Sequence, residues 1–349
     1  MTVNTALSAV ETDPIVRRPA GGRRFWSLFT RSKWVTAGLA IFAVYVLFAI
    51  IGPIIKPYDP SALSYTAILQ PPSAHHLLGT TQTGQDVLSQ LLVGFGPTLE
   101  IGFLAGVIAT AMSIIIGVGA GYFAGSAGEG LSLLSNIFLV IPQLPLLVVI
   151  SSLDAHAGSW VYAIALAVLG WAWGARVLRA QTIALAGQDF VLAAKASGES
   201  AWRIILFEIL PNELPVVATS FVFTVVGAIG SYVALCFLGL VNINSWNWGT
   251  MLFYAQSNQA MSDGAWWWYV PPGIAVALIL LGLVMLNFGL DEFINPRLRA
   301  AGITRKELKT ASKQQGITPV IRNRPRAPSG VSSAITVGDE VTSTARRHK

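Results

Sequence analysis

Six stretches of this chain are apolar over a length that can cross a lipid bilayer. Roughly 20 apolar residues are needed to span the hydrocarbon core. The stretches cover residues 34–55, 101–123, 131–153, 160–175, 214–240 and 273–290. Backbone polar groups inside a bilayer must bond to one another, so each stretch is predicted to be a helix. The sequence therefore predicts an all-α integral membrane protein with six transmembrane helices.

The composition agrees with a protein that crosses the membrane several times. Of the 349 residues, 53% are hydrophobic and only 11% are charged, whereas about a quarter are charged in soluble domains. The single cysteine, Cys236, lies in an apolar stretch and is interpreted as a packing residue. The first apolar stretch is too long for a signal-peptide core, and we expect it to be retained as a span.

The basic residues predict the orientation. Those between the fourth and fifth stretches lie on the same side as both termini, while the three loops on the other side contain only Lys56. The basic residues of the fourth-to-fifth loop are Arg176, Arg179, Lys195 and Arg203. The positive-inside rule places both termini and this loop in the cytoplasm. The net charge of +6 comes without any nucleic-acid motif, so no nucleic-acid partner is expected.

The spans divide the chain into further segments. We expect a disordered basic cytoplasmic arm over 1–33, a first helix over 34–55, an outer loop over 56–100, a membrane domain over 101–298 and a disordered basic cytoplasmic tail over 299–349. The outer loop over 241–272 carries five tryptophans. They are interpreted as an aromatic belt at the membrane surface or as a docking surface for an external partner.

The six apolar stretches contain no Asp, Glu, Lys, Arg or His. Ion-coupled carriers and voltage sensors need such groups inside the membrane, so if the chain transports a solute, the energy is expected to come from outside this chain. His75 and His76 are adjacent and unfavourable as a metal pair. Glycines four residues apart in the second stretch predict close helix packing. Pro142 and Pro145 predict a kink in the third stretch.

The cytoplasmic loop over 176–213 has the pattern of two short helices joined by a turn. Asp189 is expected to cap the first helix, which Ala193 and Ala194 make narrow. Gly198 permits the turn. The second helix is expected to be amphipathic, with one apolar face formed by Trp202, Ile205, Leu206 and Ile209.

This loop resembles the coupling loop of binding-protein-dependent ABC importer permeases of the type I fold. That family has a Glu-Ala-Ala triplet, a glycine and a later Leu-Pro. Its pattern is matched here by Ala193, Ala194, Gly198, Leu210 and Pro211. Two positions depart from it, because Leu192 replaces the Glu and Glu208 replaces an Ile.

Further motifs resemble the C-type permease of dipeptide and oligopeptide importers. The run from His76 to Ser89, HLLGTTQTGQDVLS, resembles that group's HxLGTDxxGRDVLSR segment, although Thr81 replaces its Asp and Gln85 its Arg. Other matching pieces follow in the family's order: Trp173, Ala175-Arg176, Arg179-Ala180, Phe237-Leu238-Gly239-Leu240, Trp248-Gly249, Pro272-Gly273, Asn287 and Asn295-Pro296-Arg297.

The resemblance implies a non-catalytic subunit in the bacterial plasma membrane. It would form half of a pore for di- and oligopeptides, beside a second, B-type permease. Two ABC ATPase subunits would bind ATP and magnesium, which this chain would not bind, and a substrate-binding protein would deliver solute from outside. The residues implied in coupling to the ATPase are Ala193, Ala194, Lys195, Gly198, Glu199, Ser200, Leu210 and Pro211.

Other functions remain open at this point. Related importers carry nickel chelates or sugars, and an ATP-independent secondary transporter is a third possibility. The chain contains no GxxxxGK[ST] phosphate loop of its own.

Overall fold

The computed structural model describes residues 33–153 and 158–294. Apart from an isolated β-bridge between Thr80 and Asp86, the regular structure of these residues is helical. The elements are α2 (Lys33–Ile55), α3 (Val87–Ser113), the π-helix η1 (Ile114–Val118), α4 (Gly119–Tyr122), α5 (Ser126–Val140), α6 (Gln143–Leu153), α7 (Ser159–Ala186), α8 (Asp189–Ala196), α9 (Ala201–Arg203), the π-helix η2 (Ile204–Ile209), α10 (Leu210–Phe237), α11 (Trp248–Ser257) and α12 (Trp266–Ile294).

Within the described residues, five helical runs are long and apolar enough to cross a membrane. They are Lys33–Ile55, Val87–Tyr122, Trp160–Ala186, Ala201–Phe237 and Trp266–Phe288. The pair α5 and α6 makes a sixth if it is counted as one broken span, bent by 77°. The predicted kink is confirmed, because Ile141 is extended immediately before Pro142, as the proline ring requires. The all-helical class is therefore confirmed, with five or six spans.

Several predicted boundaries were wrong because helices continue beyond the apolar stretches. The second candidate span begins at Val87, so the segment predicted as the first outer loop ends at Asp86 and not at residue 100. The fourth helix continues to Ala186, and the fifth helical run begins at Ala201. A helix ends where a cap or a turn ends it, and polarity alone does not do so. Glu100 and Glu213 consequently lie inside candidate spans, contrary to the expectation that the spans hold no ionisable residue.

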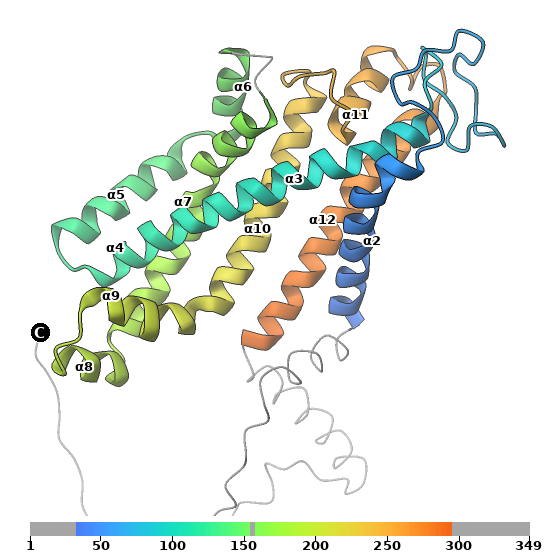
Figure 1. Ribbon diagram of the computed structural model, residues 1–349. Helices are drawn as coiled ribbons and strands as arrows, with labels where there is room; N and C mark the ends of the chain where they lie inside the picture. Colours follow the sequence, from blue (N-terminus) through green and yellow to red (C-terminus); the bar gives the residue numbers. More distant parts are fainter. Residues whose placement is uncertain (1–32, 154–157, 295–349) are drawn as a thin grey trace, which may run out of the picture. The chain divides into compact units, whose positions relative to one another are not determined.

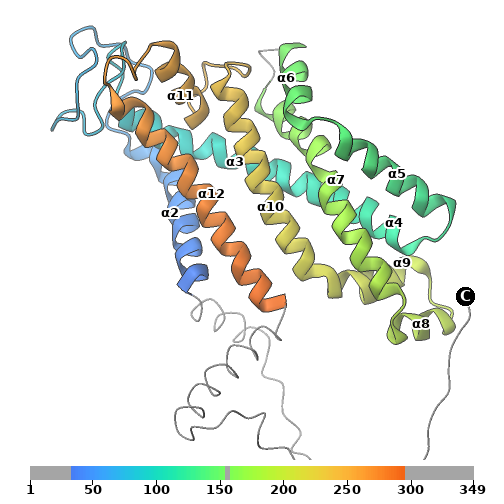
Figure 2. The same ribbon diagram turned by 180° about the vertical axis from the view of Figure 1, so that it is seen from behind.

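Helix α3 runs obliquely across α10 and α7 and packs against both (Figure 1). Figure 2 shows the same crossing from behind. Glycines allow the close approach, as predicted: Gly102 faces Ile229, and a methyl group on Gly117 would lie 2.5 Å from the Ala175 carbonyl oxygen. Gly125 differs, because its φ of 78° places it in the turn before α5.

The core beside α11 is built around Trp248. Its side chain is fully buried and packs edge-to-face on Tyr45 and Phe95, with ring centroids 5.6 and 4.9 Å away. Asn247 caps α11 by accepting a hydrogen bond from the Thr250 amide at 3.0 Å. Trp268 is also buried. The interpretations of all five tryptophans as a membrane belt or an external docking surface are therefore wrong for Trp248 and Trp268.

The segment before α3 folds into a compact turn network. Asp86 caps α3 by accepting a hydrogen bond from the Ser89 amide at 2.8 Å. The other oxygen of the same carboxylate lies 2.9 Å from His76 Nδ1. Trp267 donates its indole N–H to the Thr80 carbonyl at 3.1 Å, which fastens the segment to α12. The motif residues from His76 to Ser89 thus build the entry to α3 and to the helical run Val87–Tyr122.

The predicted disordered arm and tail lie outside the described residues, except that the arm's last residue, Lys33, begins α2. His156 and the motif at 295–297 also lie outside them. Cys236 is fully buried, which confirms its interpretation as a packing residue.

Candidate functional site

Helix α8 is a short surface helix between α7 and α9, and it lies at the end of the helices opposite to α11 (Figure 1). The predicted cap was one residue off. Gln188 occupies the N-cap position with extended backbone angles, and Asp189 is the first helical residue. The Gln188 carbonyl accepts from the amides of Val191 and Leu192, both at 3.0 Å. Asp189 instead places a negative charge at the positive end of the helix dipole.

The turn after α8 is a Schellman motif centred on Gly198. The Glu199 amide donates to the Ala194 carbonyl at 3.2 Å, and the Gly198 amide donates to the Lys195 carbonyl at 3.0 Å. Gly198 has a φ of 78°. This left-handed conformation is the one that glycine adopts without steric cost at the end of a helix. The predicted turn is confirmed, and its hydrogen bonds give the physical reason for the glycine.

One apolar residue anchors α8 to the membrane helices. The Val191 side chain is fully buried. It lies in a cluster with residues from η1, which directly continues α3, from α7 and from η2. The buried members of this cluster are Val118, Leu178, Val191, Ile204, Ile205 and Ile209. Val191 therefore joins α8 by direct packing to η1, α7 and η2.

The predicted apolar face of the second helix was partly wrong. Ile205 and Ile209 are buried, but Trp202 is 71% exposed and Leu206 is 46% exposed. The reason is that residues 204–209 form a π-helix, with i→i+5 hydrogen bonding. This wider turn puts Ile204 on the buried side, and the 3.6-residue period of an α-helix no longer applies.

The predicted coupling residues lie in two places. Ala193, Lys195, Gly198 and Ser200 are exposed on α8 and its turn, whereas Ala194 packs against the buried cluster. Leu210 and Pro211 lie farther along, in the first turn of α10. The structure brings the first group together on one surface turn and leaves the Leu-Pro pair at the entry of the next helix.

Two charged residues of the turn have partners. Lys195 Nζ lies 4.9 Å from the centre of the Tyr122 ring. This contact joins α8 to the last residue of α4. Glu199 Oε2 lies 3.2 Å from Arg203 Nε. Both contacts are at least partly exposed, so each is worth less than about 1 kcal/mol. They orient the turn more than they stabilise it.

Sequence reasoning missed a buried polar contact between α7 and α10. Thr182 Oγ1 lies 2.6 Å from Glu213 Oε1, and both side chains are almost fully buried. The second carboxyl oxygen, Oε2, has no hydrogen-bond partner among the described residues. Glu213 lies two residues after Pro211 and directly before the apolar stretch that begins at residue 214. A carboxylate at the edge of an apolar stretch was the sequence signal that could have indicated this contact.

The surface around α8 carries exposed apolar side chains. Phe190, Leu192 and Trp202 are exposed there, at 40%, 49% and 71%. Within the residues that the structure describes, no group of His, Cys, Asp or Glu is arranged to hold a metal ion. The described residues around α8 thus offer a partly apolar surface.

Comparison with known proteins decides the family. Residues 113–300 match the profile of the family described as binding-protein-dependent transport system inner membrane component. Residues 22–72 match the N-terminal TM domain of oligopeptide transport permease C. The chain belongs to this family of permeases. It is therefore a multi-pass protein of the bacterial plasma membrane.

Individual relatives cover most of the chain. The di/tripeptide transport system permease protein DppC of Pseudomonas aeruginosa (strain UCBPP-PA14) is 31% identical over 86% of this chain and 100% of its own length. The dipeptide transport system permease protein DppC of Bacillus subtilis (strain 168) is 31% identical over 78% of this chain and 85% of its own. The oligopeptide transport system permease protein OppC of Mycobacterium tuberculosis (strain ATCC 25618 / H37Rv) is 28% identical over 78% of this chain and 93% of its own length.

Proposed function

We propose that this permease forms half of the translocation pore of an ABC importer for di- and oligopeptides. Its fold would be the type I importer permease fold, with both termini and α8 in the cytoplasm. A second, B-type permease forms the other half of the pore. Two ABC ATPase subunits supply the energy, and a substrate-binding protein delivers the peptide from outside.

The observation that carries this proposal is the construction of the α8 turn. Its exposed face holds Ala193 and Gly198, while Val191 joins its buried side to the ends of three membrane helices. A surface helix that is fixed in this way transmits force from a partner to the membrane domain. ATP binding to the partner would favour one of two pore conformations by binding them with different affinity.

The names of the relatives support peptides as the substrate class. They include di/tripeptide, dipeptide and oligopeptide permeases, and a probable D,D-dipeptide permease of Escherichia coli (strain K12). These names favour peptides over the nickel chelates and sugars left open by the sequence. ATP and magnesium would be bound by the ATPase subunits.

Reconstitution tests the proposal. The complex of this chain with its second permease and ATPase subunits, placed in liposomes with the binding protein, is expected to accumulate radiolabelled di- and tripeptides only when ATP is supplied. The purified chain alone is expected to hydrolyse no ATP. ATP hydrolysis by the chain alone, or peptide uptake without ATP, would contradict the proposal.

A substitution on α8 tests the coupling role. Ala193→Glu places a charged side chain on the exposed face of α8, where we expect it to reduce ATPase association and uptake at least tenfold. Ala127→Glu, at an exposed alanine in the first turn of α5, serves as the matched control. Equal uptake by both variants at equal membrane levels would remove the coupling role from α8.

A further inference from the structure

Glu100 is an exposed carboxylate in the interior of an apolar helix. It lies in α3, within the candidate span Val87–Tyr122, and its side chain is exposed while that of the following Ile101 is 2% exposed. No hydrogen bond or ion pair joins Glu100 to any described residue. An ionisable group in this position marks a functional site by default, because lipid contact would be costly.

The neighbouring helices place Glu100 beside the interior of other candidate spans. Gly96, one turn before it, faces the Ala49 carbonyl of α2, and Gly102, just after it, faces Ile229 of α10. Ala49 and Ile229 both lie inside candidate spans, several residues from either end. Glu100 therefore lies beside the interior of two other candidate spans and not at a helix end.

The surrounding helices supply no cation to neutralise it. In α2, in α10 and in the described side chains of α12, the only basic residue is Lys33, at the first position of α2. In α7, Arg176 and Arg179 lie beside Gly117 and Gly121, at the far end of the helical run that begins with α3. Lys33 lies about 24 Å along the helix axis from Ala49 at 1.5 Å per residue. We therefore expect the carboxylate to face a water-filled path or a group brought by another molecule.

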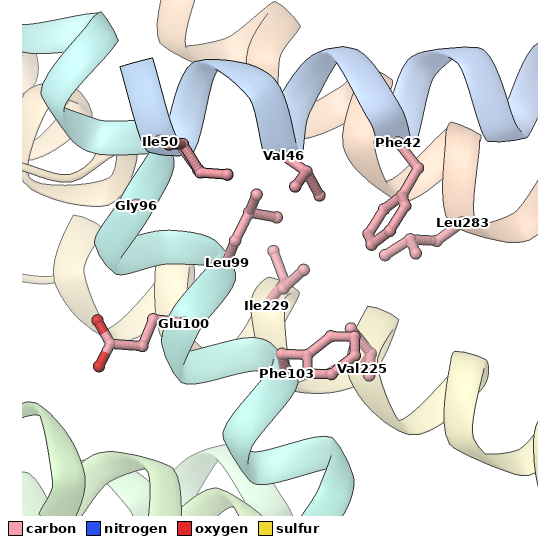
Figure 3. A pocket seen from close by; sticks show the side chains of 11 residues that line it. Phe42, Val46, Ile50, Gly96, Leu99, Glu100, Phe103, Val225, Ile229 and Leu283 are labelled. Carbon is pink, nitrogen blue, oxygen red and sulfur yellow. The ribbon is translucent and has the colours of Figure 1, made fainter. Parts of the chain in front are cut away.

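An open apolar cavity adjoins Glu100. It has a volume of about 460 Å³ and is lined by side chains of α2, α3, α10 and α12, which is within the range of small-ligand sites. Figure 3 shows Phe42, Val46, Leu99 and Leu283 around this cavity, with the Glu100 carboxylate at its rim and directed away from them. A ligand that reaches both must therefore extend over the rim, with a positive charge outside the cavity and an apolar group inside it.

We propose that Glu100 lies on the translocation path and binds the α-ammonium group of a passing peptide. The adjoining cavity accepts an apolar side chain of that peptide. This inference rests on the proposed peptide transport. The α-amino group of a peptide has a pKa near 8, so most peptide molecules carry the required charge at neutral pH. The contact is transient, because tight binding at Glu100 would slow the release of the peptide.

Chemical labelling tests the position of Glu100. In the assembled complex, Glu100→Cys is expected to react with a membrane-impermeant cationic thiol reagent, and added binding protein, dipeptide and ATP should slow the reaction. The native Cys236 is fully buried, so the unaltered chain gives the background. Glu129→Cys, at an exposed residue in the first turn of α5, gives the rate of an accessible thiol. No reaction at position 100 would show that lipid or another subunit covers it, and would overturn the proposal.

Uptake assays test the charge. Glu100→Gln is expected to lower the maximal rate of dipeptide uptake about tenfold, the factor that corresponds to losing one charge-assisted contact. Glu100→Asp should retain most of the rate, and Glu129→Gln should leave it unchanged. Assembly with the second permease is measured in each variant.

The outcomes separate the two proposals. Wild-type uptake by Glu100→Gln would overturn the role of Glu100 alone. Loss of the second permease from this variant would assign Glu100 to an ion pair with that subunit, which also overturns the inference. Absence of dipeptide uptake by the unaltered complex would overturn the proposed function, while labelling at position 100 would still report whether an aqueous path passes it.

Discussion

Gly198 shows how one backbone conformation defines the α8 turn. Two exposed glycines flank this helix, Gly187 before it and Gly198 after it, and a methyl group on either would meet no atom within 4 Å. Only Gly198 has a positive φ, of 78°, whereas Gly187 has a φ of −91°. The two positions therefore differ in backbone strain and not in available space.

This difference gives a matched pair of substitutions. Gly198→Ala should destabilise the end of α8 by about 1–2 kcal/mol, the cost of a left-handed residue that carries a Cβ, and should reduce ATP-driven uptake. Gly187→Ala should leave both unchanged. Hydrogen exchange of the amides of residues 193–199 measures the local effect. Equal exchange in the two variants would show that the Schellman turn does not hold this segment.

At the scale of elements, η1, which continues α3, packs against α7 with the two backbones in near contact. A Cβ on Gly117 would lie 2.5 Å from the Ala175 carbonyl oxygen and 2.8 Å from the Ala175 Cα. Backbone atoms cannot move aside as a flexible side chain can. Gly96 on the same helical run has more room, since its nearest neighbour would be the Ala49 oxygen at 3.6 Å.

Gly117→Ala is therefore expected to destabilise the complex by about 1–3 kcal/mol, as overpacking does in well-packed interiors. Gly96→Ala should be near neutral. The thermal unfolding midpoint of the two variants in one detergent makes the comparison. A midpoint for Gly117→Ala that equals that of Gly96→Ala would mean that the two helices separate at little cost.

The contact between α7 and α10 is polar, and a second pair of substitutions tests it. Thr182→Val removes the hydroxyl that lies 2.6 Å from Glu213 Oε1. Leaving this buried carboxyl without its partner should cost about 1–3 kcal/mol. The double variant Thr182→Val with Glu213→Leu should recover part of the loss, because no polar group is then left unpaired. Unfolding midpoints check this, and an additive loss in the double variant would contradict it.

At the scale of the whole molecule, the orientation in the membrane can be measured with two exposed serines. Ser197 lies in the turn after α8, and Ser262 lies in the segment between α11 and α12. Figure 1 shows α8 and α11 at opposite ends of the helices. An impermeant thiol reagent added to spheroplasts should label Ser262→Cys at once. Ser197→Cys should react only after permeabilisation. The reverse pattern would place α8 outside and contradict a contact with a cytoplasmic ATPase.

The sequence by itself determined the all-helical membrane class, the break at Pro142 and the family. The hydropathy of a stretch is a sum over its own residues. A proline or a turn glycine acts through its own backbone. These signals therefore do not depend on residues that are distant in the sequence. The motif residues Ala193 and Gly198 carried the family resemblance for the same reason, since they form one local turn.

Only the tertiary structure decided where the helices end, which face of residues 201–209 is buried, and what the two carboxylates contact. The π-helix at 204–209 changes the buried face, and the Asp86 cap sets the start of α3. Glu100 and Glu213 lie within two residues of the apolar stretches at 101 and 214, so hydropathy alone assigned them to loops. Their burial, exposure and partners depend on which helices pack beside them, and no local pattern in the chain encodes that.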